Sequence, residues 1–520
     1  MVNKRKIQDA AMMMTRRDFS SMMAEVATAQ AFLGFGSAFS ADASADELTS
    51  LSLMEVAAKI RSGSLTSTEV TEACLARIAV YDPKLDAFIT VMKELALAQA
   101  RQLDAEQKAG KLRGPLHGVP VALKDNIDTA GTRTTAASAL FEDRVPNADA
   151  PVVTRLKDAG AVIIGKTNLH EFAMGGGDSS FWGPARNPWN LAHNTGGSSS
   201  GSGAAVCASL AYGALGTDTG GSVRNPASYC GIVGMIATYG LVPIRGIIPL
   251  TVSLDHCGPL TRTVADTAQM LNILAGYDKL DITSIEHSRE DYVAALQQPV
   301  NGFRLGMPVS HFDDLDPEVA KATQDAITLL GKLTQGTKDV TLPAITSWPN
   351  LGMLGETLAY HEQYLKSSAA KYMLPQRRRM EAALANPPKA ADYIRAKWDL
   401  DLLRRTVDGS FTDFDLVVMP TMRILPPLLD DLIKRSHDPK LIDPLITNNT
   451  PPFDVYGLPA ISIPCGFSKS GLPIGLMIAG PRFSEGRVLA LAQAYERATE
   501  WHKRKPPLTP NTAVPPVVTG

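Results

Sequence analysis

The amino-acid sequence predicts an α/β protein, a single domain with a central mixed β-sheet surrounded by α-helices. Three observations favour this class. Of the 520 residues, 45% are hydrophobic, which is enough apolar material for a large buried core. After Gly110, short apolar runs are separated by glycine and proline, as expected for buried strands. Segments with helical spacing alternate with these runs, and such alternation is typical of a sheet covered by helices.

Two helices are expected near the start of the folded region. Ser52 with Glu55, and Thr66 with Glu69, match the capping box, in which a hydroxyl and a carboxylate bind free amides of the first turn. The second helix has one apolar face, formed by Val70, Cys74, Leu75 and Ile78. We expect a third helix over residues 85–108.

The next part of the chain predicts strands that alternate with helices. Strands are expected over residues 119–123, 161–164 and 214–216, and helices over 152–159 and 204–210. The first strand ends at Lys124, and the last leads into a glycine loop. Residues 457–464 are expected to return to the core as another strand.

The chain is expected to divide into a leader, one domain and a tail. Residues 1–45 contain Arg16 and Arg17 ahead of a weakly apolar stretch, which resembles a twin-arginine export signal. This predicts export to the periplasm, with a cytoplasmic location as the alternative. Residues 46–505 form the domain, within which residues 281–443 are helical and variable. Residues 506–520 form a proline-rich tail.

The overall composition excludes several classes of protein. The formal net charge is −2, so a nucleic-acid-binding surface is not expected, and the run of arginines at 377–379 indicates a solvated helix face. None of the five cysteines forms a C-x-x-C pair, which argues against a zinc site or a disulfide framework. No apolar run approaches the ~20 residues of a spanning helix.

Two glycine loops that carry serines hold the strongest chemical signal. They cover residues 196–203 and 216–224 and flank one predicted helix. Glycine allows the backbone to approach a ligand closely and to direct several amides at one point. A phosphate cradle is disfavoured, because no loop reads G-x-x-x-x-G-K-[ST]. An α/β-hydrolase elbow with Ser199 as nucleophile satisfies G-x-S-x-G, although this motif is weak inside a Gly/Ser-rich run. Activation of a serine by a lysine is the third possibility.

Several short segments in a fixed order add to this signal. They are residues 118–126, 165–168, 196–224, 231–235, 258–260, 457–460 and 471–475. Together they resemble the amidase-signature family over nearly the whole chain from Leu51 onward. The resemblance implies that Lys124 is the base, that Ser198 is a bridging serine after a cis peptide, and that Ser222 is the nucleophile. It implies that the oxyanion is bound by the amides of Thr219, Gly220, Gly221 and Ser222.

The physical chemistry of lysine agrees with this assignment. A lysine acts as a base only when it is neutral, and a free lysine titrates near ~10.4. Burial disfavours the charged form, so a lysine at the end of a core strand has a lowered pKa. Lys124 can then accept the proton of Ser198 while Ser198 accepts that of Ser222.

Other residues near these motifs are expected to have structural roles. Lys166 is a rival base, but its segment matches a different part of the family pattern. Ser199 and Ser200 are expected to hydrogen-bond to backbone, although Ser199 is kept as a candidate substrate contact. Asp218 and Arg224 are expected to orient the nucleophile loop. Structural roles are also expected for His117, His170, His193 and His256.

The resemblance also predicts residues of a substrate pocket, and the sequence differs from the family pattern at one motif position. Met174, Gly175 and Gly176 align with a family segment that lines the acyl pocket, and their small size suggests space near the scissile carbonyl. Ile236 stands where the family often has a lysine after Gly-Met. Residues 281–443 match poorly, and in this family such regions shape the choice of substrate.

The sequence therefore predicts an amidohydrolase that cleaves the C–N bond of a small-molecule amide, with no metal and no organic cofactor. Three alternatives stay open. Some family members supply ammonia for tRNA-dependent amidation, in the cytoplasm and within a complex. An esterase of the α/β-hydrolase kind and a non-catalytic binding scaffold are the others. The oligomeric state is left open.

Overall fold

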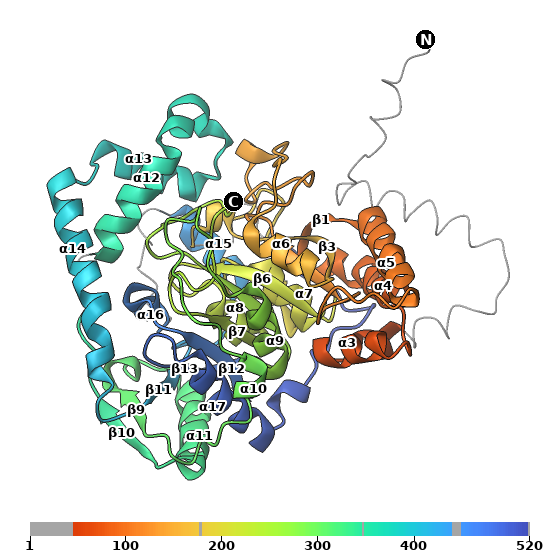
Figure 1. Ribbon diagram of the computed structural model, residues 1–520. Coiled ribbons are helices and arrows are strands. Elements are labelled where there is room, and N and C mark those ends of the chain that lie inside the picture. Colours follow the sequence, from red (N-terminus) through yellow and green to blue (C-terminus); the bar gives the residue numbers. More distant parts are fainter. Residues whose placement is uncertain (1–44, 176–178, 346–347, 439–448, 518–520) are drawn as a thin grey trace.

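The computed structural model describes residues 45–175, 179–345, 348–438 and 449–517 (Figure 1). The predicted export leader lies outside these residues except for Ala45. A mixed sheet runs through the molecule, in agreement with the predicted fold class. In sheet order its strands are β1 (Phe88–Val91), β3 (Val162–Thr167), β2 (Pro120–Lys124), β6 (Gly213–Asp218), β8 (His256–Thr261), β7 (Val233–Ile236), β12 (Ala460–Phe467), β13 (Pro473–Ala479), β11 (Leu416–Pro420), β9 (Leu305–Pro308) and β10 (Thr337–Val340). The short strands β4 (Arg186–Asn187) and β5 (Asn190–Asn194) form a separate ribbon.

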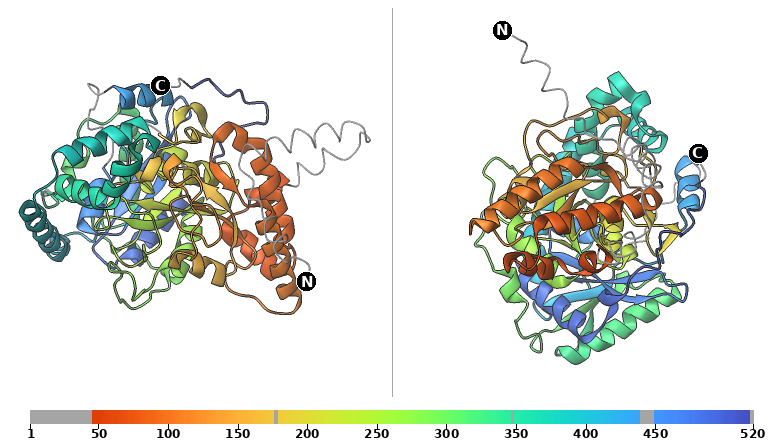
Figure 2. Two further views of the ribbon diagram at one scale, coloured as in Figure 1. Left: turned by 90° about the horizontal axis from the view of Figure 1, so that it is seen from above. Right: turned by 90° about the vertical axis from the view of Figure 1, so that its right-hand side faces the viewer.

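Helices cover the sheet and also lie at both ends of the molecule. They are α3 (Leu53–Arg61), α4 (Ser67–Leu85), α5 (Lys93–Lys108), α6 (Pro151–Asp158), α7 (Ser200–Cys207), α8 (Arg224–Cys230), α9 (Val264–Leu274), α10 (Tyr292–Ala295), α11 (Pro317–Leu333), α12 (Trp348–Ser368), α13 (Leu374–Ala385), α14 (Ala390–Thr406), α15 (Leu429–His437), α16 (Pro451–Tyr456) and α17 (Glu485–Ala498). The helices α3 to α5 lie at one end of the molecule, and α12 to α14 lie at the opposite end (Figures 1 and 2). Among the described residues, no helix is long and apolar enough to span a bilayer.

Both predicted capping boxes are confirmed. Ser52 Oγ accepts the amide of Glu55 at 3.1 Å, and Glu55 Oε2 accepts the amide of Ser52 at 2.7 Å. Thr66 and Glu69 make the same reciprocal pair at the start of α4.

The single helix predicted over residues 85–108 is wrong, because this segment contains a strand. Asp86 adopts a left-handed conformation with φ +52° and ends α4. The β-branched and aromatic residues of β1 then pair antiparallel with β3, and α5 begins only at Lys93. Long-range pairing therefore decides the conformation here over helical spacing.

The described part of residues 281–443 is largely helical, but it also contains β9, β10 and β11. Strand β11 is fully buried and pairs with β13 and with β9, so this region contributes directly to the central sheet. Helices α12, α13 and α14 pack on one another outside it.

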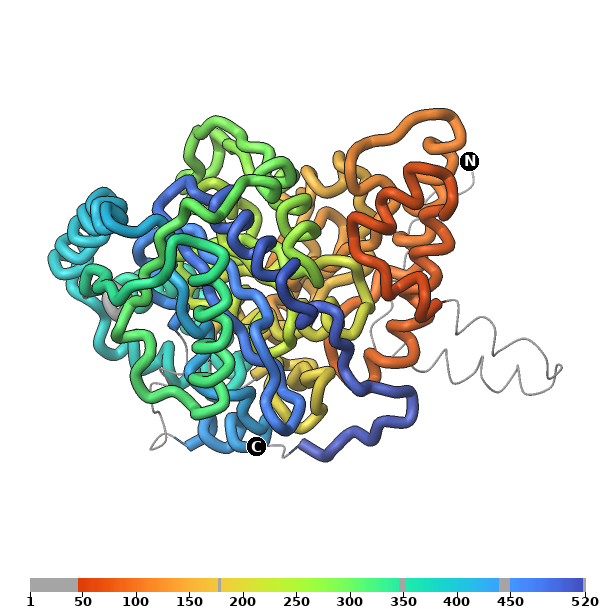
Figure 3. Tube along the Cα trace, turned by 90° about the horizontal axis from the view of Figure 1, so that it is seen from below, coloured from red at the N-terminus to blue at the C-terminus, as the bar shows by residue number. Residues whose placement is uncertain are grey.

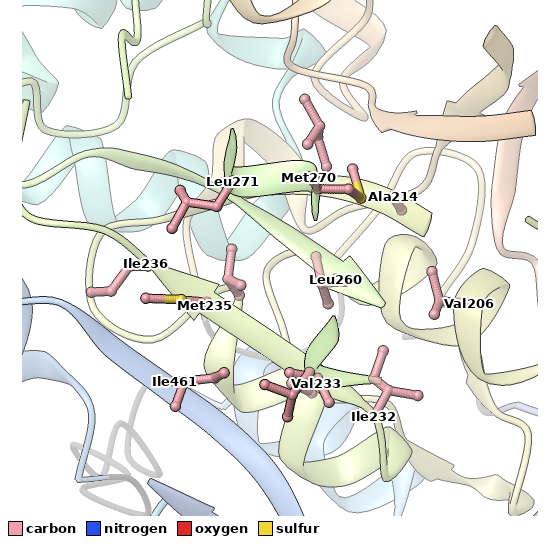
Figure 4. Packing of buried hydrophobic residues seen from close by; sticks show 14 of the residues in the cluster. Val206, Ala214, Ile232, Val233, Met235, Ile236, Leu260, Met270, Leu271 and Ile461 are labelled. Atoms are coloured by element: carbon pink, nitrogen blue, oxygen red, sulfur yellow. The ribbon is translucent and has the colours of Figure 1, made fainter. Parts of the chain in front are cut away.

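The core lies between the sheet and its covering helices. Met235, Leu260 and Ile461 come from three neighbouring strands and meet in it (Figure 4). Ile236, which the resemblance places where the family often has a lysine, is fully buried on β7 opposite Ala460. An apolar residue fits this place because no water reaches it.

The C-terminal segment after η6 (Trp501–Lys503) follows an extended course along the molecule (Figure 3). Lys84 Nζ donates a hydrogen bond to the carbonyl of Thr512 at 2.9 Å, which ties this segment to α4.

Candidate active site

The candidate site lies where two parallel strands end. Strands β2 and β6 pair in parallel, with Leu123 opposite Leu215, so Lys124 and Asp218 end at the same edge of the sheet. The loop before α7 and the loop between β6 and α8 meet there, because the Ser199 amide donates to the carbonyl of Ser222 at 3.2 Å. The carboxyl edge of parallel strands is a common location for ligand sites in α/β proteins.

Lys124 is fully buried and faces hydroxyl groups. Its Nζ lies 2.8 Å from Ser198 Oγ, 2.7 Å from Thr217 Oγ1 and 3.3 Å from the Thr217 carbonyl. Burial lowers the pKa of Lys124 to about 7, and the carboxylates of Asp218 and Asp255 oppose this shift only in part. A large fraction of the amine is therefore neutral near neutral pH and able to accept a proton.

The two serines differ in exposure. Ser198 follows a cis peptide bond with Gly197 and is fully buried. Ser222 is partly exposed, and among the described residues no group is hydrogen-bonded to its hydroxyl. A buried serine therefore lies next to the amine, and an accessible serine lies in the adjoining loop.

The loop that carries Ser222 is organised by one carboxylate. Asp218 accepts the amides of Gly221, of Val223 at 3.0 Å and of Arg224 at 3.3 Å. Gly221 has φ +127°, and a Cβ there would collide with the Thr450 hydroxyl, so only glycine fits. Because its amide is bound to Asp218, Gly221 is not free to bind an oxyanion as predicted.

A buried arginine links this loop to α16. Arg224 Nε donates to Asp218 Oδ2 at 3.0 Å, and Arg224 Nη2 donates to Asp454 Oδ2 at 2.5 Å. All three side chains are fully buried. Burial alone raises the pKa of a carboxyl, but Arg224 holds the pKa of Asp218 well below its usual range, whereas burial keeps that of Asp454 well above it. Arg224 thus pairs with two carboxyl groups whose pKa values are shifted in opposite directions.

Three functional neighbours were not predicted from the sequence: Asp255, Thr450 and Asp454. Thr219 Oγ1 donates to Asp255 Oδ1 at 2.6 Å, and Thr450 Oγ1 donates to the Gly220 carbonyl at 2.8 Å. These contacts fix the loop around the amides of Thr219 and Gly220. Thr450 and Asp454 lie more than 200 residues from the loop in sequence, and no motif marks them.

The predicted structural residues lie beside this centre. Ser199 is buried, and its hydroxyl bonds to the carbonyl and the amide of Thr217 at 3.2 Å each, so it contacts backbone. Lys166 Nζ donates to the Ile127 carbonyl at 2.6 Å and to Thr134 Oγ1 at 2.7 Å, and lies 3.5 Å from Asp125. His256 Nδ1 lies 2.7 Å from the Leu254 carbonyl, and burial lowers its pKa to about 4.

The predicted acyl-pocket segment borders an apolar pocket. Met174 is buried and lines it together with residues from α12 and α13, Gly175 follows, and Gly176 lies outside the described residues. The other lining residues are Leu250, Met353, Leu354, Thr357, Leu358, Arg379, Met380 and Ala383. The helical region thus contributes side chains beside Met174.

The chain matches the model of the family described as Amidase over residues 69–489. It is 40% identical, over 89% of its length and 100% of the relative's, to the A subunit of the glutamyl-tRNA(Gln) amidotransferase of Geobacter sp. (strain M21). A solved peptide amidase in complex with chymostatin is 34% identical with a TM-score of 0.77, and covers 88% of this chain and 99% of its own. A 6-aminohexanoate cyclic dimer hydrolase is 28% identical with a TM-score of 0.79, with the same coverage.

These relatives confirm the resemblance found in the sequence. The curated relatives favour the amidotransferase alternative at least as strongly as the hydrolase, whereas the solved structures include hydrolases. The chain therefore belongs to the amidase family and is a hydrolase of carbon–nitrogen bonds.

Proposed function

We propose that this chain cleaves a carboxylic amide through an acyl-enzyme on Ser222, with Lys124 as the general base acting through Ser198. The observation that carries this proposal is the fully buried Lys124 amine 2.8 Å from Ser198 Oγ, with a pKa lowered to about 7. Near pH 7, a large fraction of such an amine is neutral and can accept a proton.

In each half of the reaction, a proton moves through Ser198 to Lys124 and back again. Lys124 accepts the proton of Ser198, Ser198 accepts that of Ser222, and Ser222 Oγ attacks the amide carbon. The C–N bond then breaks, and the leaving nitrogen takes the proton that Lys124 returns through Ser198. Water then attacks the acyl-enzyme ester on Ser222 and gives its proton to Lys124 through Ser198. The proton returns to Ser222 Oγ as the ester bond breaks, which restores the Ser222 hydroxyl.

The oxyanion of the tetrahedral intermediate is bound by the amides of Thr219, Gly220 and Ser222. Among the described residues, none of these three amides has a backbone or side-chain acceptor, whereas that of Gly221 is bound to Asp218. Preorganised amides of this kind stabilise charge that develops in the transition state, by about 3 kcal/mol for one donor.

The apolar pocket beside Met174 supports a substrate with an apolar acyl or side group. Leu250, Met353 and Met380 line it with Met174. The pocket has a free volume of about 20 Å³, so it admits only a small apolar group. Amides with short aliphatic acyl groups are therefore the preferred candidates.

A second candidate is an ammonia-supplying component of an amidotransferase. The observation that favours it is the 40% identity to curated proteins that are named as A subunits of such an enzyme. Both candidates share the acyl-enzyme on Ser222, and they differ in where the ammonia goes and in the need for partner subunits.

Export by the twin-arginine route is a further part of this proposal. It is supported by Arg16 and Arg17 ahead of a weakly apolar stretch. A free-standing hydrolase fits export better than a component of an amidotransferase. Fusion of residues 1–45 to a reporter, with Arg16 and Arg17 both replaced by lysine as control, measures it directly.

The test is release of ammonia and amines from glutamine and from aliphatic, aryl and peptide amides by the isolated chain. Turnover of apolar amides supports the hydrolase, and activity confined to glutamine and dependent on added subunits supports the amidotransferase. Ser222→Ala is expected to lower kcat by about 10³-fold or more. Ser199→Ala is the matched control, and loss of turnover in that variant with retention in Ser222→Ala would support the elbow mechanism instead.

A further inference from the structure

Helix α14 exposes a line of large apolar side chains. Its inner face, with Ala396, Leu400 and Leu403, is buried. Ile394, Trp398 and Leu402 are 46%, 67% and 61% exposed. Because they are spaced four residues apart, they lie in one row along the helix, here called the α14 stripe.

Helix α14, which carries the α14 stripe, lies at the outer edge of the molecule (Figure 1). Arg404 on the same helix donates to the Val455 carbonyl at 2.9 Å and to the Ser253 carbonyl at 2.7 Å, which anchors the inner face. Single exposed apolar residues are common on protein surfaces, whereas a rigid row centred on tryptophan has the composition of an interface core.

The charges around Trp398 are arranged with opposite signs before and after it. Arg395 and Lys397 precede it, and Asp399 and Asp401 follow it. At 100° per residue, Arg395 and Asp399 border one side of the stripe, and Lys397 and Asp401 border the other. Each side of the stripe therefore carries one basic residue before Trp398 and one acidic residue after it.

This arrangement of charges is self-complementary when two copies of α14 pack in antiparallel orientation. We propose that the α14 stripe binds the α14 stripe of a second copy of this chain, antiparallel, with the two Trp398 side chains meeting at a twofold axis. Ile394 then packs against Leu402 of the second copy. Isologous contacts of this kind are the commonest way in which soluble proteins form dimers.

The reversed pairing also matches the charges. Arg395 lies about one turn or less from Asp399 of the second copy on one side, and Lys397 lies equally near Asp401 of the second copy on the other. A parallel pairing would bring like charges together and is disfavoured. Within one chain, Lys397 already pairs with Asp401, and both remain exposed enough to bridge to a neighbour.

The charge balance favours a second copy over a membrane surface. Helices that lie on bilayers have polar faces rich in lysine and arginine. Around the α14 stripe, three basic residues are matched by three acidic ones, namely Arg395, Lys397 and Arg405 with Asp392, Asp399 and Asp401. One helix pair buries less than the roughly 1,200 Å² of a standard stable interface, so we expect reversible association in the micromolar range.

The experiment uses two charge variants of the full chain, Arg395→Asp/Lys397→Asp and Asp399→Lys/Asp401→Lys. Sedimentation velocity from about 1 to 100 µM measures association of each variant, and of a 1:1 mixture. The wild type is expected to dimerise as concentration rises, each variant to stay monomeric, and the mixture to recover dimer at least tenfold more strongly than either variant alone.

Ile282→Ser is the matched control, because Ile282 is 93% exposed but lies outside α14, and this variant is expected to dimerise like the wild type. Thermal unfolding checks that all variants are folded. Monomeric wild type at every concentration would overturn the proposal, as would dimers that the charge variants do not weaken. Trp398-dependent binding of monomer to phosphatidylglycerol vesicles would assign the α14 stripe to a membrane instead.

Discussion

Two buried lysines lie at the ends of neighbouring strands, and their surroundings give them different chemistry. Lys124 ends β2, and Lys166 lies near the end of β3, in parallel register with Leu123. Both are fully buried, and burial lowers the pKa of each. Each amine contacts a hydroxyl and a carbonyl, but Lys166 also has the Asp125 carboxylate 3.5 Å away.

The comparison shows that burial alone does not make a base. A carboxylate beside Lys166 favours its charged form, so that lysine serves as half of an ion pair. Among the described residues, Lys124 has no carboxylate in contact, and its hydroxyl neighbours include that of Ser198. We therefore assign the two roles from the groups that each amine contacts, and not from its burial.

Replacing each lysine with methionine gives the sharpest test of this difference. Lys124→Met is expected to lower kcat by about 10³-fold while thermal unfolding stays close to that of the wild type, because an apolar chain of similar size fits the buried space. Retained turnover in this variant would show that Lys124 is not the general base.

Lys166→Met is expected to act on stability. Asp125 would be left buried without its counter-charge, and the free energy of unfolding should fall by about 3–5 kcal/mol. Denaturant titration measures this change. If stability were intact and kcat fell, the roles of the two lysines would be reversed.

The pH dependence of kcat/KM tests the role of Lys124 as a base. Its pKa of about 7 means that the amine is neutral above this pH and charged below it. We expect kcat/KM to fall about tenfold per unit as pH drops below 7, and to level off above it. A flat profile from pH 5 to 9 with a neutral substrate contradicts a base with this pKa.

The smallest effect is expected from removing the whole ion pair. In Lys166→Met/Asp125→Asn, no uncompensated charge remains, so the loss of stability should be about 1–2 kcal/mol and smaller than in Lys166→Met alone. A double variant as unstable as the single one would show that Lys166 acts through its bonds to Ile127 and Thr134 rather than through the charge pair.

The sequence predicted the parts of the site that lie on motifs. The apolar run before Lys124 predicted that this lysine ends a strand. The glycine loops marked the region of the site, and the resemblance to the amidase-signature family predicted the roles of Ser198 and Ser222 within them. Asp454 was not predicted, because it is brought to Arg224 only by the packing of α16. The strand β1 was missed for a related reason, since pairing with β3 overrides the helical spacing of its residues.

The buried triad of Asp218, Arg224 and Asp454 has a consequence for the response to ionic strength. Dissolved ions screen charges that water reaches and hardly affect those that it does not. The three side chains are fully buried, whereas Lys397 and Asp401 on α14 keep 36% and 49% of their side-chain surface exposed. Added sodium chloride should therefore weaken the association of two copies and leave the geometry of the Ser222 loop unchanged. One chain would thus have a salt-sensitive contact at its edge and a salt-insensitive reaction centre.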